Sequence, residues 1–407
     1  MKFVSRALVA LSLLFTPSVA TADLREETLR QAALKAGLVP VEQLMPEVSK
    51  ERAELGRILF EDTRLSLNGG TSCQTCHLDR FASADGLPMG IGVGAEGEGV
   101  DRARSGGALI PRNVLPLWGR GAPQFDVFFW DGKVDASNGH VVSQFGGLAP
   151  SSDPLVVAVH LPFVEIREMV TDDAVVKDTL MTESVESANA IYVSLMERLR
   201  EDEKLMQAMA EAFGVPKGDL TFLHVAEAVA DFIRFKFQVR QTKLHDFVFA
   251  GGPLTPAEME GGLVFYGKGR CALCHNGPLF SDLRFHAIPL PQYGFGKNGF
   301  GIDYGRFNVT FDVADLYKFR TPPLYNVAAT APYSHSGSLY DLRDVIGSHF
   351  DPLATVRGDE MTEVERIELY RRIAVWGDEN LYQAPLNAAE IDALVAFLST
   401  LSFPGLE

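Results

Sequence analysis

The sequence has no long hydrophobic run, little basic charge and only four cysteines among its 407 residues. No apolar stretch reaches the roughly 20 residues that a transmembrane helix needs, so we expect no membrane insertion. The 37 lysines and arginines face 53 aspartates and glutamates, for a net charge of −16. A chain this acidic is a poor partner for nucleic acid or for anionic membrane surfaces. Low-complexity segments are missing too, and 46% hydrophobic with 22% charged residues is typical of a globular protein.

The first 22 residues have the features of a secretory signal peptide. Lys2 and Arg6 give a basic start, residues 7–15 form a short apolar run, and Ala20-Thr21-Ala22 is a small-residue cleavage site. We therefore expect export to the periplasm, which leaves a more acidic mature chain long enough for two or three domains.

All four cysteines fall in two copies of one pattern, Cys-x-x-Cys-His, at 73–77 and 271–275. This pattern attaches a c-type haem, because the two thiols bind its vinyl groups and the adjacent histidine becomes the proximal iron ligand. A thioredoxin-like redox pair or a zinc site explains the double match poorly, since a zinc site needs its second ligand pair nearby. We therefore predict two covalently bound haem c groups. Their attachment and ligand residues would be Cys73, Cys76 and His77 for the first, and Cys271, Cys274 and His275 for the second.

The spacing of the two motifs gives each haem room for its own domain. Residues 186–213 and 219–248 show the clearest helical periodicity, and the Gly-Gly-Pro at 251–253 then interrupts it. A last amphipathic helix is expected after Asn387, an N-cap that Glu390 completes. Similar apolar segments, Gly-Arg-Ile-Leu-Phe at 56–60 and Gly-Leu-Val-Phe-Tyr at 262–266, precede the two haem motifs and indicate a weak internal repeat.

Few segments alternate as strands do, so the predicted fold is mainly α, with long loops and little strand. It would hold two cytochrome c-like haem domains, one over 23–250 and one over 251–407, after the signal peptide at 1–22.

The residue opposite each proximal histidine decides whether a haem binds small molecules or only transfers electrons. No histidine lies between His77 and His140, and Met89 sits in a Gly/Pro-rich loop where packing is its usual role. The first haem is therefore predicted to be five-coordinate and open to peroxide or water.

The second haem has several candidate sixth ligands. No methionine follows His275 until Met361, so a His/Met pair is hard to build. His286, His335 and His349 remain, and an apparent helix starting near residue 339 could carry the last of them across the haem face.

Further motifs resemble those of the bacterial dihaem cytochrome c peroxidase and MauG superfamily, and the resemblance covers nearly the whole mature chain. They are Arg112-Asn113, Phe129-Trp130-Asp131-Gly132, Pro162 with Glu168-Met169, Phe319-Arg320-Thr321-Pro322, and the run from Thr330 to Gly337. The resemblance implies a peroxidatic haem in the N-terminal domain and an electron-transfer haem in the C-terminal domain.

The same resemblance implies roles for individual residues. Glu168 and Pro162 match the distal acid and proline of the first haem, where a carboxylate can move a proton between the two oxygens of hydrogen peroxide. Trp130 matches a tryptophan between the haems that can relay electrons. The side chain of Asn113 and the backbone carbonyls of Thr330 and Pro332 match the ligands of a calcium ion between the domains, a hard cation that prefers oxygen.

The chain departs from the family pattern at two positions. Classical members place a displaceable histidine just after a Val-Gly or similar pair, whereas here Val93-Gly94 is followed by Ala95. The sixth ligand of the second haem matches His349, where other members have methionine or, in MauG, tyrosine. The missing histidine resembles MauG and its relatives, which need no reductive activation. His349 matches neither ligand, and a bis-histidine haem should have a lower potential than a His/Met haem. An insertion around 138–159 has no assigned role.

We therefore predict a periplasmic dihaem oxidoreductase that reduces hydrogen peroxide at the first haem. Its electrons would pass through the second haem from a c-type cytochrome or another periplasmic donor. The alternative is a MauG-like oxidase that uses peroxide to modify a tryptophan of a partner protein. A non-catalytic electron carrier or haem sensor is a third class, which an open distal face with Glu168 argues against.

Overall fold

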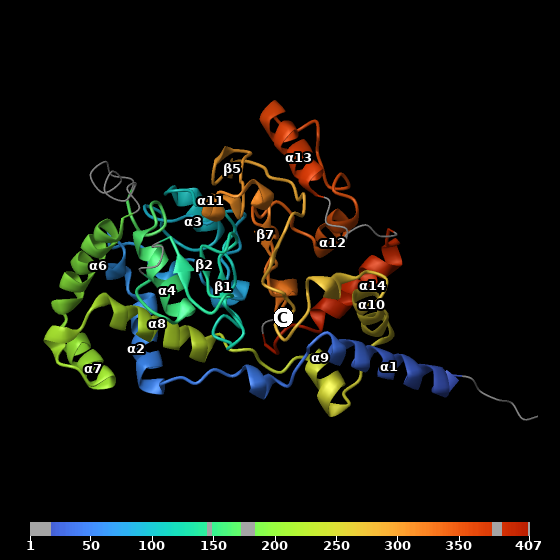
Figure 1. The fold of residues 1–407 in the computed structure, drawn as a ribbon, viewed down its shortest axis with the longest axis horizontal. Coiled ribbons are helices and arrows are strands. Elements are labelled where there is room, and N and C mark those ends of the chain that lie inside the picture. Colours follow the sequence, from blue (N-terminus) through green and yellow to red (C-terminus); the bar gives the residue numbers. More distant parts are fainter. Residues whose placement is uncertain (1–17, 145–148, 172–183, 377–384, 406–407) are drawn as a thin grey trace, which may run out of the picture.

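The computed structural model describes residues 18–144, 149–171, 184–376 and 385–405. It is mainly helical with short strands and long loops, which confirms the predicted fold class (Figure 1). The helices are α1 (Ser18–Lys35), α2 (Lys50–Glu61), α3 (Val100–Ser105), α4 (Pro154–His160), α6 (Val185–Arg200), α7 (Glu203–Phe213), α8 (Phe222–Lys236), α9 (Lys243–His245), α10 (Pro256–Tyr266), α11 (Phe307–Thr310), α12 (Leu342–Phe350), α13 (Glu363–Val375) and α14 (Ala388–Ser399). The strands are β1 (Val127–Phe128), β2 (Val134–Asp135), β3 (Val142–Ser143), β4 (Phe285–His286), β5 (Phe295–Gly296), β6 (Gly299–Phe300) and β7 (Phe319–Arg320).

The strands form three small antiparallel sheets, in the orders β1-β2-β3, β4-β7 and β5-β6. In the second sheet Phe285 lies opposite Arg320. The backbone N–H of Arg320 also donates to the carbonyl of Trp130 at 2.8 Å, just beyond the end of β1. Sheets this short contribute little core, and their effect here is to fix loops from distant parts of the sequence beside one another.

Two helix pairs, α2 with α8 and α10 with α14, make the most extensive contacts among the described elements. A Cβ built on Gly56 of α2 would lie 1.9 Å from the carbonyl oxygen of Ala228 in α8. A Cβ on Gly261 of α10 would lie at the same distance from the carbonyl oxygen of Ala393 in α14. Each glycine therefore lets two helix backbones touch, and each helix leads into one haem motif.

The internal repeat is real, but its register is one residue away from the predicted one. Gly56 corresponds to Gly261 rather than to Gly262, because the two contacts just described are equivalent. Phe60 packs on Phe232 at 5.0 Å between ring centroids, and Phe265 packs on Phe397 at 5.1 Å, four residues after each glycine. The consecutive glycines at 261 and 262 made the register ambiguous from sequence.

Two predicted helix boundaries were wrong for a local reason. The helix predicted over 186–213 is interrupted at Asp202, whose side chain accepts a hydrogen bond from Leu205 N at 3.1 Å and caps α7. The helix predicted over 219–248 ends at Lys236, and helical structure resumes only at α9, which the side chain of Thr242 caps. Caps of this kind offer the backbone N–H groups a partner outside the preceding helix.

The C-terminal helix forms as predicted. Asn387 accepts a hydrogen bond from Glu390 N at 3.0 Å, and the Glu390 carboxylate accepts from Asn387 N at 2.8 Å. This reciprocal capping box starts α14, whose Leu394 and Phe397 are buried against α10.

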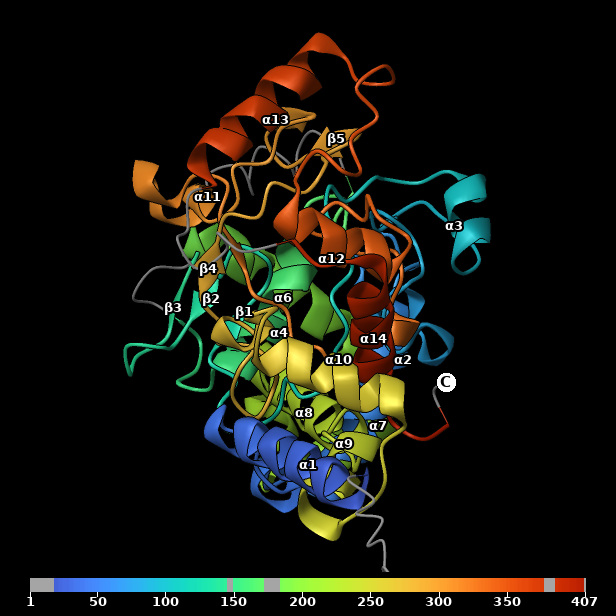
Figure 2. The ribbon, with the colours of Figure 1, turned by 90° about the vertical axis from the view of Figure 1, so that its right-hand side faces the viewer.

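Helix α1 packs against α10, close to α9, at the side of the molecule that carries the second haem motif (Figures 1 and 2). Residues 1–17 of the predicted signal peptide lie outside the described residues. Within the described ranges, no helix is long and apolar enough to cross a membrane.

Candidate functional site

The first haem motif follows α2 and places His77 in a partly buried position beside Phe60. Nδ1 of His77 lies 2.8 Å from the carbonyl oxygen of Ser83, which can only accept, so Nδ1 carries the proton. Burial lowers the pKa of His77 to about 4, and the ring is therefore neutral with a lone pair on Nε2. A neutral imidazole held through its other nitrogen is the form in which histidine binds a metal.

The second motif repeats this arrangement. Nδ1 of His275 donates to the carbonyl of Phe280 at 3.0 Å, and burial lowers the pKa of His275 to about 4. His349, on α12, lines the same cavity, and its Nδ1 donates to the carbonyl of Val345 at 2.7 Å. Both rings thus keep Nε2 available, and they lie close enough to interact electrostatically. The structure therefore brings together two histidines with the protonation that axial ligands need.

The other two histidine candidates already have hydrogen-bond partners at Nε2. His335 is hydrogen bonded through Nε2 to Oε1 of Gln292 at 2.8 Å, and its ring stacks on Phe319 with 3.7 Å between centroids. Nε2 of His286 lies 2.9 Å from a carboxylate oxygen of Asp282. The geometry favours His349 over both as the partner of His275.

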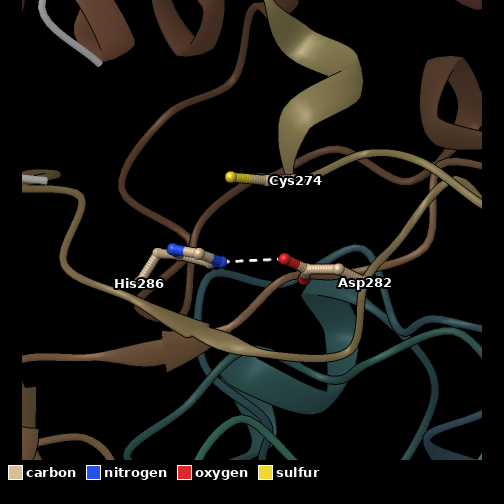
Figure 3. A group of neighbouring side chains, drawn as sticks. All are labelled: Cys274, Asp282 and His286. Carbon is tan, nitrogen blue, oxygen red and sulfur yellow. Dashed lines mark hydrogen bonds and ion pairs between the residues drawn. The ribbon is translucent and has the colours of Figure 1, made fainter. Parts of the chain in front are cut away.

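Cys274, Asp282 and His286 converge closely enough to hold a small metal ion, with their ligand atoms all within 4.8 Å of one another (Figure 3). Cys274 belongs to the second haem motif, however, and a cysteine joined to a haem vinyl group is no longer a thiolate ligand. The cluster is therefore part of the haem site, with the Asp282–His286 pair beside the attachment cysteine.

The distal side of the first cavity is built from two segments held in close contact. Val93 N donates to the carbonyl of Arg167 at 3.0 Å, and a Cβ on Gly92 would lie only 1.7 Å from the same oxygen. Arg167 itself has a positive φ of 77°, within the tight turn that ends at Val170. Glycine at 92 therefore lets this turn present Glu168 to the cavity that also contains Cys73, Cys76 and His77.

Glu168 is the catalytic candidate with the most strongly altered acidity. Burial is the main cause that raises its pKa to about 7, and the charge of Glu165 adds to the effect while Lys133 opposes it. Pro162 lines the same cavity, as the family resemblance implied. A carboxyl group with a pKa near neutrality can both accept and donate a proton at physiological pH.

Sequence reasoning missed four charged residues of this cavity: Arg120, Lys133, Glu165 and Lys297. Nζ of Lys133 lies 2.8 Å from Glu165 and 4.6 Å from the centroid of the Phe129 ring. Glu165 could have been found from its position three residues before Glu168 in the same turn. Lys297 reaches the cavity from the β5–β6 turn, and nothing local in the sequence indicates this.

Trp130 lines both haem cavities and is 9% exposed. Its indole Nε1 donates to the carbonyl of Asn113 at 3.0 Å, and Asn113 lines both cavities as well. The ring is therefore held between the two sites at which haems would be attached.

The residues around Trp130 are fixed by a buried ion-pair network. Arg112 pairs with Asp131 at 2.6 Å and with Asp303 at 2.8 Å, and both carboxylates have no exposed side-chain surface. Lys297 adds a longer contact to Asp131 at 3.6 Å. These charges hold the pKa of Asp131 well below its usual range despite its burial.

Asn113, Thr330 and Pro332, the predicted calcium ligands, all lie on the wall of the second cavity. The amide of Asn113 donates through Nδ2 to the carbonyls of Leu87 at 2.9 Å and Pro88 at 3.4 Å, which leaves Oδ1 as the oxygen able to bind a cation. Three neutral oxygens fit part of a calcium shell of six to eight, so waters would have to supply the rest.

The insertion around 138–159 forms one wall of the first cavity. Its described part contains β3 and most of α4, and α4 packs against α8. Leu155, Ala158 and Val159 of α4 line the cavity that contains His77. The side chain of Asp153 caps α4 by accepting from Leu155 N at 3.0 Å. The insertion therefore supplies apolar cover for the first haem site.

Comparison with known proteins places these features in a family. The family model for di-haem cytochrome c peroxidase matches residues 50–250. The cytochrome-c peroxidase IdrP2 of Denitromonas iodatirespirans is 27% identical over 387 residues, covering 88% of this chain and 84% of the relative. The methylamine utilization protein MauG of Methylorubrum extorquens is 28% identical over 369 residues, covering 86% of each chain.

Solved structures give the same result for the fold. The crystal structure of a MauG-like protein associated with microbial copper homeostasis matches with a TM-score of 0.63 at 25% identity, covering 91% of this chain and 93% of that one. The diheme peroxidase BthA of Burkholderia thailandensis matches with a TM-score of 0.65 at 21% identity, covering 90% of each chain.

Proposed function

Because the chain belongs to the di-haem cytochrome c peroxidase family and is a peroxidase-like oxidoreductase, we propose that it reduces hydrogen peroxide at the first haem, with electrons arriving through the second. The observation that carries this proposal is the first cavity itself. Among its lining residues in the described part of the chain, His77 is accompanied by no second histidine and no methionine, while Glu168 faces the same space. Lys133 of the same cavity is paired with Glu165.

The haem bound at the first site supplies an iron at which hydrogen peroxide takes up two electrons and two protons to give two waters. Glu168 would accept a proton from one peroxide oxygen and donate it to the other, which leaves as water. Pro162 and the apolar residues of α4 would limit the water that competes for this space. Trp130 would carry electrons from the second site, where His275 and His349 would hold the haem iron.

The loop that carries Ala95 supports an enzyme that needs no prior reduction. Buried Arg102 donates to the carbonyls of Ile91, Gly92 and Ala95 at 2.6, 2.7 and 3.1 Å. These three bonds hold the loop in place, and Ala95 stands where classical members of the family have the displaceable histidine. The loop therefore offers no side chain that must leave the iron. The fully oxidised protein should therefore react with peroxide directly.

This feature also favours a second candidate, a MauG-like oxidase that uses peroxide to modify a tryptophan of a partner protein. Both functions share the chemistry at the first haem and differ in the source of electrons. Mixing the oxidised protein with peroxide, then with a reduced c-type cytochrome, tests both steps. An unchanged haem spectrum after peroxide would refute the shared proposal. Peroxide reaction without oxidation of two cytochromes per peroxide would refute the peroxidase and leave the protein-modifying enzyme.

We further propose a calcium ion at Asn113, Thr330 and Pro332, and a domain boundary near residue 250. Metal analysis of protein dialysed against a chelator, before and after calcium is added back, tests the first. A periplasmic location is proposed from the signal-like residues 1–22, and cell fractionation tests it.

A further inference from the structure

Two buried arginines, Arg120 and Arg320, lack an acidic partner although one lies at each haem cavity. Arg120 is 8% exposed and lines the first cavity, whereas Arg320 is 1% exposed and lines the second. Neither forms an ion pair with the carboxylates of the described residues. The one carboxylate that acts on Arg320, Asp282, is itself hydrogen bonded to His286. Burying a cation without a counter-charge is costly, so each site is expected to have an anion.

The two guanidinium groups also share one aromatic ring. The guanidinium carbon of Arg120 lies 5.7 Å from the centroid of Phe125, and that of Arg320 lies 5.4 Å from it. Burial lowers the pKa of Arg120 to about 10 and that of Arg320 to about 9, and the charge of Arg120 adds to the effect on Arg320. Both remain charged at neutral pH, so this region holds two adjacent positive charges.

Each guanidinium keeps at least one nitrogen that makes no hydrogen bond to the described chain. Arg120 donates through Nε to the carbonyl of Pro116 at 2.7 Å. Arg320 donates through Nε to Phe129 O at 2.9 Å and through Nη1 to Thr321 O at 3.1 Å, while its buried Nη2 has no partner in the described chain. Arg102, by contrast, uses Nε, Nη1 and Nη2 on three backbone carbonyls.

We propose that Arg120 binds a propionate of the first haem and Arg320 a propionate of the second, so that the pair around Phe125 links the two cofactors electrostatically. A guanidinium is suited to a carboxylate because its planar donors can form two parallel bonds. The two cavities already share Asn113, Leu115 and Trp130, and the arginine pair therefore lies in the region between the haem sites. The inference rests on the two haems of the proposed function and not on which donor or substrate they serve.

A nearby positive charge favours the reduced state of a haem, and removing it should lower that haem's reduction potential. The test is a redox titration of the complete dihaem protein in which Arg120→Gln and Arg320→Gln are compared with wild type. We expect Arg120→Gln to lower the potential of the first haem more than that of the second, and Arg320→Gln to do the reverse. Resonance Raman bands of the haem propionates should shift in the same haem-selective way.

Arg240→Gln is the matched control, because Arg240 is exposed and its guanidinium lies over the ring of Trp118 at 4.9 Å, outside the residues that line either cavity. Arg120→Lys and Arg320→Lys keep the charge and should retain most of each potential while still shifting the propionate bands. The proposal would be overturned if the haem potentials and propionate bands of the glutamine variants matched those of Arg240→Gln. If the glutamine variants fail to fold, unshifted propionate bands in the lysine variants would overturn it instead. Because potentials and Raman bands need no peroxide, failure of the proposed activity would be seen separately.

Discussion

Replacement of Glu168 by glutamine is the most direct test of the distal site. The side chain keeps its shape and hydrogen-bonding size but can no longer accept and return a proton. General acid–base catalysis contributes about 10²–10⁴-fold to such reactions, so the rate of reaction with hydrogen peroxide should fall by that factor. Stopped-flow absorbance of the haem, after the oxidised protein is mixed with peroxide, measures this rate.

The acidity of Glu168 adds a second, independent expectation. Its pKa is raised from 4.5 to about 7, mainly by burial, and the ionised form is the one that takes a proton from peroxide. The wild-type rate should therefore fall about tenfold for each pH unit below 7, and the Glu168→Gln variant should show no such slope. If the variant keeps both the wild-type rate and the wild-type pH slope, Glu168 has a purely structural role.

The raised pKa of Glu168 should also make the free energy of unfolding depend on pH. A carboxyl whose pKa is raised on folding contributes stability at low pH that is lost as pH rises from about 4.5 through about 7. The shift corresponds to roughly 3 kcal/mol at most. Glu168→Gln removes this loss, so the variant should have a higher free energy of unfolding than wild type at pH 8 and no such advantage near pH 4.

Glu165→Gln is the control for Glu168→Gln, because it changes a neighbouring carboxylate of the same cavity that is not proposed to transfer the proton. It removes the charge that raises the pKa of Glu168 and releases Lys133, which lowers that pKa. The midpoint of the rate profile should therefore move to lower pH while the rate at pH 7 is kept. A loss as large as that of Glu168→Gln would show that the effect is not specific to the proton-transferring residue.

Four further substitutions, with one control, test the rest of the structure. His349→Ala should convert the second haem from low-spin to high-spin, while the first haem stays high-spin. Electron paramagnetic resonance measures this, and a low-spin signal that survives in the variant would show that His349 does not bind the iron. Trp130→Phe should leave the reaction of the first haem with peroxide intact but slow electron transfer from the second, and an unchanged inter-haem rate in stopped-flow experiments would reduce Trp130 to a packing residue. Gly56→Ala and Gly261→Ala should each destabilise the fold by about 1–3 kcal/mol or more, because the added Cβ would overlap a carbonyl of the facing helix. Gly218→Ala is the control, since Gly218 has open space around it. In thermal unfolding, this control should differ little from wild type.

The sequence alone determined the features that depend on neighbouring residues. The two haem motifs could be identified because attachment needs both thiols and the histidine within five residues, and the capping box at Asn387 and Glu390 is equally local. The prediction of an open first haem followed from the missing histidines after His77. Family resemblance added Glu168 and Trp130, which the structure places at the first cavity and between the two cavities.

Tertiary structure decided which distant side chains share a site. Lys297 enters the first cavity from another part of the chain, where it pairs with Asp131. Helix α1 packs against α10, the helix that leads into the second haem motif. The meeting of Arg120 and Arg320 at Phe125 has no local signature either, since it depends on how β7 lies beside the segment that carries Trp130. The haem motifs depend only on the spacing of cysteine and histidine along the chain. The electrostatic environment of each haem is set only when the chain folds and excludes water from the charged side chains around the cavities.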